Sequence, residues 1–217
     1  MIFAILLAAV EPAPKNAIEA ERAFAAGAQT LGQWTAFRKW AGFAAVMFVP
    51  KVVNAREWLR DKKDPPKSVR WQPAQSFQSC DGLTAINVGP WQRPDGSFGY
   101  FTTVWIYEDA LIARPKWQWV YDAGDTLKVP MRAPAKPSIR RAACDSIPAD
   151  TDPRRWAIPS APSPDSPEAQ QAGLHSRDGS LRYEYTVDAA GSRRFTASLW
   201  NGRQFEQVLD QSTAAPK

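Results

Sequence analysis

Histidine is almost absent from this 217-residue chain, in which His175 is the only example. Its scarcity excludes a histidine metal site and a catalytic triad built on histidine. The glycine-rich loops that bind phosphate groups or dinucleotides are also missing. His175 itself lies in the polar segment GLHSRDG, which is typical of a surface turn. We therefore expect neither a metal ion nor a cofactor.

Clusters of basic residues are missing too, although the formal net charge is +5. No run of Lys or Arg exceeds two residues, so we expect no nucleic-acid partner. Cysteine is limited to Cys80 and Cys144, whose spacing fits neither a metal site nor a CxxC motif. In an oxidising compartment the pair would close a loop of about 64 residues, worth roughly 4 kcal/mol by the chain-entropy model. Two unpaired thiols are the alternative.

The chain has one notable apolar run, Ile2–Val10, and its nine residues are too few for a membrane-spanning helix. The run matches the apolar part of a secretory signal, with Ala8 and Ala9 near a plausible cleavage point. We therefore predict a signal peptide and leader over residues 1–15, no membrane span after its removal, and a periplasmic or secreted protein. A first strand or helix of the domain is the alternative.

Tryptophan is abundant, and eight of the ten tryptophans lie between Trp34 and Trp119. Apolar residues at helical spacing predict a helix over 16–31 and a shorter one carrying Trp34, Phe37 and Trp40. Asn54, with Glu57 three residues later, has the pattern of a capped helix start. Strands are expected at 45–49, 69–80, 83–91, 97–108 and 116–122.

The chain changes character after residue 127. Residues 128–167 contain nine of the nineteen prolines, which predicts a linker. Residues 168–217 then predict a small C-terminal appendage, a three-stranded β meander with a hairpin turn at Asn201-Gly202. Three strands alone are marginally stable, so the appendage should dock on the front domain or on a second copy of the chain. The expected strands are 180–187, 193–200 and 204–209.

Six segments support a resemblance to a known family. They are AERAF (20–24), AAVMFVP (44–50), NAREWL (54–59), GPWQRPDG (89–96), GYFTTVW (99–105) and WVYDAGD (119–125). Over residues 16–127 the chain resembles the SnoaL-like group of the nuclear transport factor 2-like superfamily. The resemblance implies an α+β fold, in which a cone-shaped, curved antiparallel sheet has N-terminal helices across its mouth, and it makes a homodimer an expectation. Members include isomerases, cyclases, dehydratases and binding modules, so the fold does not choose the activity.

Candidate site residues follow from the strands of this cone. An isomerase-like mechanism needs a carboxylate base in an apolar pocket and a neutral donor, for which Asp122 and Tyr100 are the best candidates. Side-chain alternation along 116–122 is expected to put Trp119 and Tyr121 on one face and Asp122 on the other. The predicted walls of a ligand pocket are Trp58, Trp91, Trp105, Trp119 and Tyr121.

Three functions are compatible with these residues. The leading hypothesis is an exported protein that binds a small apolar or aromatic molecule without catalysis. The second is an isomerase, dehydratase or cyclase with Asp122 as base, and the third is an assembly module with a filled cone. A cavity of several hundred Å³ with a carboxylate facing a tyrosine hydroxyl would favour the enzyme, and the same cavity lined only by indoles and aliphatic side chains would favour binding.

Overall fold

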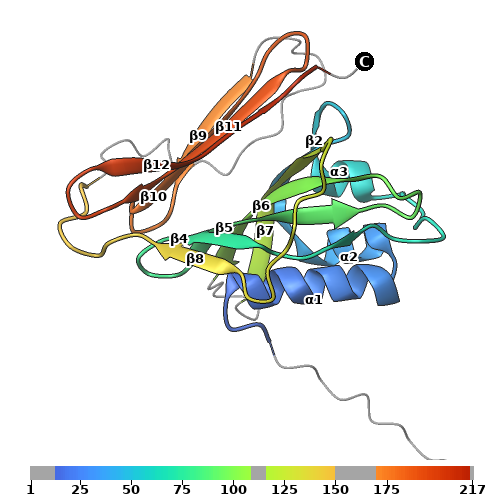
Figure 1. Ribbon diagram of the computed structural model, residues 1–217, viewed down its shortest axis with the longest axis horizontal. Helices are drawn as coiled ribbons and strands as arrows, with labels where there is room; N and C mark the ends of the chain where they lie inside the picture. The colour runs from blue at the N-terminus through green and yellow to red at the C-terminus, as the bar shows by residue number, and fades with distance from the viewer. Residues whose placement is uncertain (1–12, 109–115, 150–169, 216–217) are drawn as a thin grey trace, which may run out of the picture.

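The computed structural model describes residues 13–108, 116–149 and 170–215. Most of the predicted signal and leader, and the second half of the predicted linker, lie outside these residues. Within them the chain is a mixed helix and sheet protein with three layers: helices, a main sheet and a second sheet (Figure 1). No helix in these ranges is both long and apolar enough to cross a membrane.

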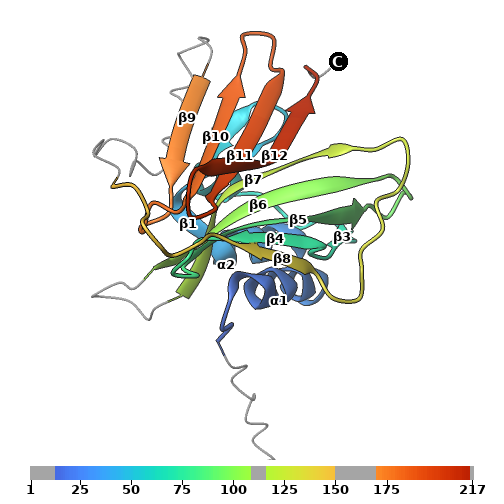
Figure 2. The same cartoon turned by 60° about the vertical axis from the view of Figure 1, so that its left-hand side comes forward.

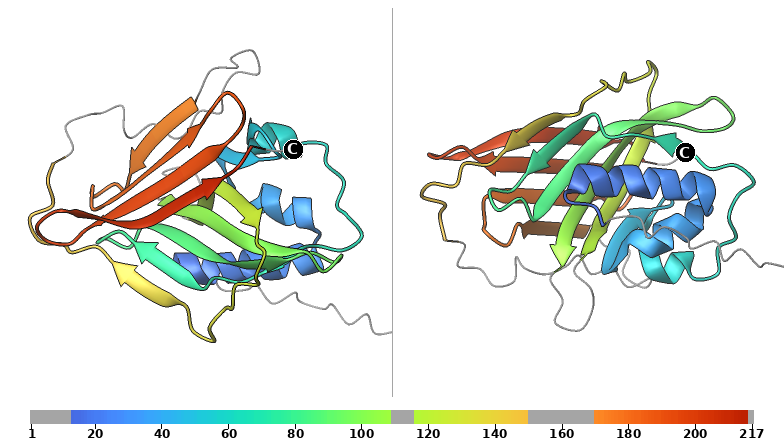
Figure 3. Two further views of the ribbon diagram at one scale, coloured as in Figure 1. Left: turned by 45° about the horizontal axis from the view of Figure 1, so that its top comes forward. Right: turned by 90° about the horizontal axis from the view of Figure 1, so that it is seen from below.

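The three helices lie on one face of the main sheet, with the longest crossing its strands (Figure 3). Two of them have an asparagine as the N-cap residue, immediately before the first helical residue. The side chain of Asn16 accepts a hydrogen bond from the Glu19 N–H at 2.9 Å, and that of Asn54 accepts one from the Glu57 N–H at 3.1 Å. Such caps satisfy N–H groups that have no partner within the helix, and the cap predicted at Asn54 is confirmed. The helices are α1 (Ala17–Thr30), α2 (Gln33–Trp40) and α3 (Ala55–Leu59).

The main sheet contains eight strands. They are β1 (Ala41–Phe48), β2 (Val52–Asn54), β3 (Arg70–Trp71), β4 (Gln75–Gln78), β5 (Thr84–Gln92), β6 (Phe98–Glu108), β7 (Lys116–Thr126) and β8 (Ser138–Arg141). Their order is β2-β1-β7-β6-β5-β4-β8, with β3 paired to β5. Pro73 separates β3 from β4, because proline cannot donate to a strand ladder. The strand β8 lies inside the stretch predicted as a linker and pairs in parallel with β4.

A bulge in β7 decides which of its side chains face the helices. The pairing of β6 with β7 shifts by one residue at Val120. As a result Trp119 packs on the helix side, whereas Val120 and Tyr121 both pack on the opposite side. Asp122 then returns to the helix side. The strict alternation expected from the sequence, with Trp119 and Tyr121 on one face, is therefore wrong at this point.

The C-terminal residues form a second, antiparallel sheet with the order β12-β11-β10-β9 (Figure 2). Its strands are β9 (Gln170–His175), β10 (Leu181–Val187), β11 (Arg193–Trp200) and β12 (Phe205–Thr213). The sequence predicted three of these four strands. The additional strand β9 begins QQAG, which has neither β-branched residues nor a clear apolar alternation, so it carries no strand signal of its own.

The second sheet packs on the face of the main sheet that the helices leave free. Tyr185 and Phe195 of the second sheet share one apolar core with Val104 and Tyr121 of the main sheet. The Tyr121 ring centroid lies 4.8 Å from that of Phe195 and 5.4 Å from that of Tyr185. The appendage therefore docks on its own front domain, the first of the two arrangements that the sequence left open.

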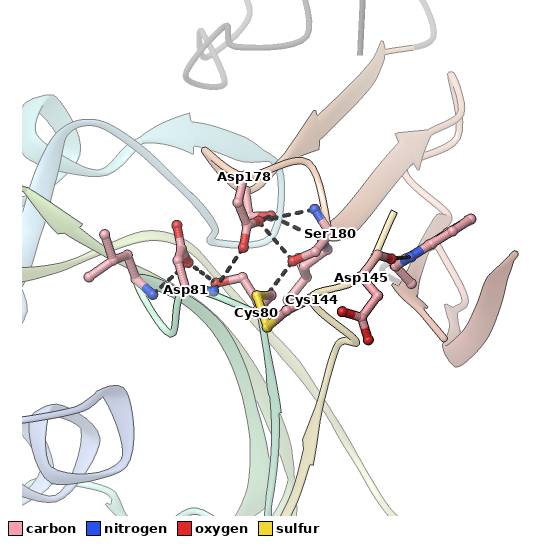
Figure 4. Close-up of a disulfide and its surroundings, with 11 residues drawn as sticks. Cys80, Asp81, Cys144, Asp145, Asp178 and Ser180 are labelled. Carbon is pink, nitrogen blue, oxygen red and sulfur yellow. Dashed lines mark hydrogen bonds between the residues drawn. A yellow bond between two sulfur atoms is a disulfide. The ribbon is translucent and has the colours of Figure 1, made fainter. Parts of the chain in front are cut away.

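Cys80 and Cys144 form a disulfide close to the line along which the two sheets meet (Figure 4). Their Cα atoms are 5.2 Å apart. Beside the bridge, the Cys80 N–H donates to Ser180 Oγ at 2.8 Å, and the Asp81 N–H donates to Asp178 Oδ2 at 2.8 Å. Because Asp178 and Ser180 belong to the turn before β10, these bonds attach the second sheet to the end of β4.

Candidate functional site

A cavity of about 460 Å³ opens beside α2, at the ends of β5 and β7. Five aromatic side chains line it: Trp34, Phe37, Phe48, Trp71 and Trp91. Asp122 also contributes to the lining, from the helix-facing side of β7. The volume is within the usual range for pockets that hold a small molecule.

Trp91 is a fixed wall of this cavity. Its indole N–H donates to the Tyr100 backbone oxygen at 2.8 Å, and the Arg93 guanidinium lies 4.5 Å from the ring centroid. The ring also lies over Gly99, where a Cβ atom would overlap both the indole and the Asp125 backbone oxygen. Only glycine at position 99 allows this close approach, so the backbone itself sets the position of the wall.

Trp58 supports the cavity from behind. Its ring centroid lies 5.2 Å from that of Trp34, at an interplanar angle of 81°. The Lys62 ammonium lies 4.3 Å from the centroid of Trp58. On its other side Trp34 packs edge-on against Phe37, with centroids 5.4 Å apart. Trp58 thus orients a wall residue and does not itself line the cavity.

Asp122 is one of two carboxyl groups in the lining of the cavity. It accepts a hydrogen bond on Oδ2 from the Thr103 hydroxyl at 3.0 Å. Burial raises the pKa of Asp122 to about 7, against the opposing effects of the Thr103 hydrogen bond and the positive charge of Arg193. A carboxyl with this pKa exchanges its proton near neutral pH, which suits either a hydrogen-bond anchor or a base.

A second carboxyl, that of Glu21, lies behind the aromatic walls and is 0% exposed. Its oxygens accept three N–H groups: Trp71 Nε1 at 2.8 Å, Trp105 Nε1 at 2.6 Å and Asn87 Nδ2 at 3.3 Å. Burial raises the pKa of Glu21 to about 7; the three hydrogen bonds oppose this shift, and the charge of Asp122 adds to it. Glu21 therefore holds the Trp71 wall through a hydrogen bond to its indole.

Polar side chains connect the two carboxyl groups across the main sheet. Asn87 and Thr103 are directly opposite each other in the pairing of β5 with β6. Asn87 donates to Glu21 and to the Ala17 backbone oxygen, whereas Thr103 donates to Asp122. The Asn87 Oδ1 atom is buried and has no hydrogen-bond partner among the described residues. The helix-facing side of the sheet therefore carries a polar row within an otherwise aromatic core.

The predicted pairing of Asp122 with a tyrosine hydroxyl is not formed. The Tyr100 hydroxyl lies 3.4 Å from Thr213 Oγ1 of β12, on the face covered by the second sheet. Tyr121 is buried in the core between the two sheets, as a consequence of the bulge at Val120. Both tyrosines therefore point away from the cavity, and neither serves it as a donor or as a wall.

Of the four predicted indole walls, one lines the cavity, two fill the core, and Trp58 supports Trp34 from behind. Trp91 lines the cavity, whereas Trp105 and Trp119 are each 0% exposed and pack around Phe24 of α1. The aromatic residues that sequence reasoning did not assign to the pocket are Trp34, Phe37, Phe48 and Trp71.

One signal in the sequence points to a residue that was missed, and another missed residue carries no such signal. Glu21 lies four residues after Ala17 and three before Phe24, so it falls on the apolar face of its helix, an unusual place for a carboxylate. Trp71 pairs with Trp91 across β3 and β5, but only the observed register reveals this. In the part of the chain that the structure describes, no group of three or more His, Cys, Asp or Glu side chains is arranged to hold a metal ion.

Comparison with known proteins adds no further assignment. No family model matches the sequence, and no curated protein matches it. The resemblance to the SnoaL-like group therefore stays a prediction, and the function has to be inferred from the geometry of the cavity.

Proposed function

We propose that this protein is exported and that it binds a small, largely apolar aromatic molecule, without turnover, in the cavity beside Asp122. The observation that carries the proposal is the convergence of five aromatic side chains on a cavity of about 460 Å³ that also contains the carboxyl of Asp122. In this proposal the main sheet is the curved sheet of a SnoaL-like cone, and the three helices cover its mouth.

Export is supported by two independent features. The first is the apolar run Ile2–Val10, which has the composition of a signal sequence. The second is the disulfide between Cys80 and Cys144, a bond that persists in oxidising compartments. Together they favour the periplasm or the extracellular space.

The walls favour a flat, apolar ligand. The rings of Trp34 and Phe37 meet edge to face, and Trp91 is held by its hydrogen bond to the backbone, so the aromatic surfaces are in place before a ligand arrives. Stacking or edge contact with a ligand ring contributes about 0.5–1.5 kcal/mol per pair beyond the burial of apolar area. Preorganised walls also lower the entropy cost of binding.

Asp122 would anchor a polar group of the ligand. Because the pKa of Asp122 is about 7, the carboxyl is largely protonated below this pH and donates a hydrogen bond; above it the carboxylate accepts one. A ligand with a carbonyl group facing Asp122 would therefore bind more tightly as pH falls through 7.

A second candidate function is proton abstraction by Asp122. The raised pKa of a carboxyl in an aromatic cavity favours it, because a general base works best when its pKa is close to the working pH. The orientation of Tyr100 and Tyr121 away from the cavity removes the neutral donor that an isomerase-like mechanism would use. Binding without turnover is therefore the better supported of the two.

The proposal is tested by fluorescence titration with N-phenyl-1-naphthylamine, an uncharged aromatic probe. Thr126 lines the cavity and is exposed, so Thr126→Trp adds bulk there without disturbing the core. We expect saturable binding to the wild type and at least about tenfold weaker binding to Thr126→Trp. The control is Thr126→Val, because valine is similar in size to threonine, and this variant should bind the probe like the wild type. Absence of binding to the wild type, or equal binding to Thr126→Trp, would overturn the proposal.

A further inference from the structure

A second cavity, of about 390 Å³, adjoins the first. Trp71 and Trp91 line both cavities and therefore form their common wall. Phe98 of β6 and Met131, in the segment that leads from β7 to β8, line the second cavity on its other sides. Part of the proline-rich stretch predicted as a linker is thus a wall of a cavity.

The two tryptophans of the common wall offer a ligand their ring surfaces, because their indole N–H groups already donate hydrogen bonds within the protein. Trp71 and Trp91 are directly opposite each other in the pairing of β3 with β5. The N–H of Trp71 is bound by Glu21, and the N–H of Trp91 is bound by the Tyr100 backbone oxygen. Since both indole N–H groups already have acceptors within the protein, a ligand meets these two side chains through apolar contact.

The two cavities differ in charge. The first contains the carboxyl groups of Asp122 and Asp125, together with the cationic side chains of Lys67 and Arg93. Among the residues that the structure describes, the second contains one charged side chain, the guanidinium of Arg70, and no carboxyl. Arg70 is exposed, and its guanidinium forms no hydrogen bond or ion pair within the described parts of the chain.

We propose that the second cavity binds the anionic group of the ligand whose aromatic body lies in the first cavity, with Arg70 as the anion-binding residue. The inference rests on the proposed function and narrows the ligand to aromatic carboxylates, sulfonates or sulfates. In the first cavity the carboxyl groups of Asp122 and Asp125 offset the cationic side chains of Lys67 and Arg93, whereas Arg70 has no carboxyl beside it in the lining of the second. A guanidinium pairs with anionic groups of this kind through two parallel hydrogen bonds. The rings of Trp71 and Trp91 bridge the two ends of the ligand.

Two probes with the same ring system separate this inference from the proposed function. One is 8-anilinonaphthalene-1-sulfonate, and the other is its uncharged counterpart, N-phenyl-1-naphthylamine. We expect the wild type to bind the sulfonate more tightly than the uncharged probe. Arg70→Gln should weaken sulfonate binding about tenfold and leave binding of the uncharged probe unchanged, because it removes a charge-assisted hydrogen bond only.

Arg22→Gln is the matched control, since it removes the same charge from an exposed position on α1 outside both cavities. It should leave the affinity for both probes unchanged. Met131→Glu, at a side chain that is 36% exposed, is a second variant and should weaken binding of the sulfonate alone. The preference for the sulfonate should also decrease at high salt, which screens the ion pair.

The outcomes distinguish the two proposals. If the uncharged probe binds but the sulfonate binds no more tightly, or if Arg70→Gln and Arg22→Gln have equal effects, the anion subsite is wrong and the proposed function stands. If neither probe binds the wild type, both fail. Weaker binding of the sulfonate alone in Arg70→Gln and in Met131→Glu supports the anion subsite.

Discussion

At the scale of single residues, two opposing effects act on the pKa of Glu21. Complete burial disfavours its charged form, while hydrogen bonds from Trp71, Trp105 and Asn87 favour it. Burial is the larger effect, and the pKa is raised to about 7. Glu21 is therefore protonated in the folded protein at pH values where an exposed glutamate is ionised.

Replacement of Glu21 by glutamine should flatten the dependence of stability on pH. The pKa rises from 4.5, its ordinary value, to about 7 on folding, so between these values the folded state binds more protons than the unfolded state. The resulting stabilisation is fully present below about pH 4.5 and is lost as pH rises through 7, a change of about 3 kcal/mol. Urea unfolding of wild type and Glu21→Gln between pH 4 and pH 8 measures the difference, with pH steps of about one unit.

Glu57→Gln, which removes an exposed carboxyl from α3, is the control for this measurement and should retain the wild-type slope. The raised pKa of buried Glu21 would be refuted if Glu21→Gln followed the same slope as the wild type across this pH range.

At the scale of elements, the helices and most strands could be predicted because their signals are local. The apolar period of α1 and the cap at Asn54 depend only on nearby residues, and both are observed. The bulge at Val120 is different, because it depends on how β7 pairs with β6. That single extra residue turns Tyr121 away from the cavity, which explains why its predicted role as a wall is not seen.

The disulfide joins the segments that follow β4 and β8, two neighbouring strands of the main sheet, and its removal should be costly. Cys80 and Cys144 are 64 residues apart in sequence. For a loop of this length the chain-entropy model predicts that the double variant Cys80→Ala/Cys144→Ala loses about 4 kcal/mol of unfolding free energy. Urea unfolding under non-reducing conditions provides the measurement.

Reduced wild type is the matched reference, because it should unfold at the same urea concentration as the double variant. A thiol count of two on the native, non-reduced wild type would rule out the bridge. Equal stability of oxidised wild type and double variant would show that the bridge does not contribute to the folded state.

At the scale of the whole molecule, the two faces of the main sheet have separate roles. The second sheet buries one face in a core that includes Tyr121 and Phe195, and the helices cover the other face around Glu21 and Phe24. The cavity remains where α2 and the ends of β5 and β7 leave space. One face thus provides stability, and the other provides the candidate site.

The composition of the site could be predicted only in part from the sequence. Asp122 and Trp91 were named because each lies on a recognisable strand, and both line the cavity. Trp34 and Trp71 come from separate elements that meet only in the folded chain, so no local pattern assigns them to one pocket. The docking of the second sheet on the face to which Tyr100 points is likewise a property of the whole fold.

The most direct test of the account is a crystal structure of the protein with N-phenyl-1-naphthylamine bound. We predict that the naphthyl ring lies between Trp34, Phe37 and Trp91, with its edge facing Asp122. A probe found between the two sheets or on the outer surface, with the aromatic walls in contact with one another and no space beside Asp122, would contradict the central claim.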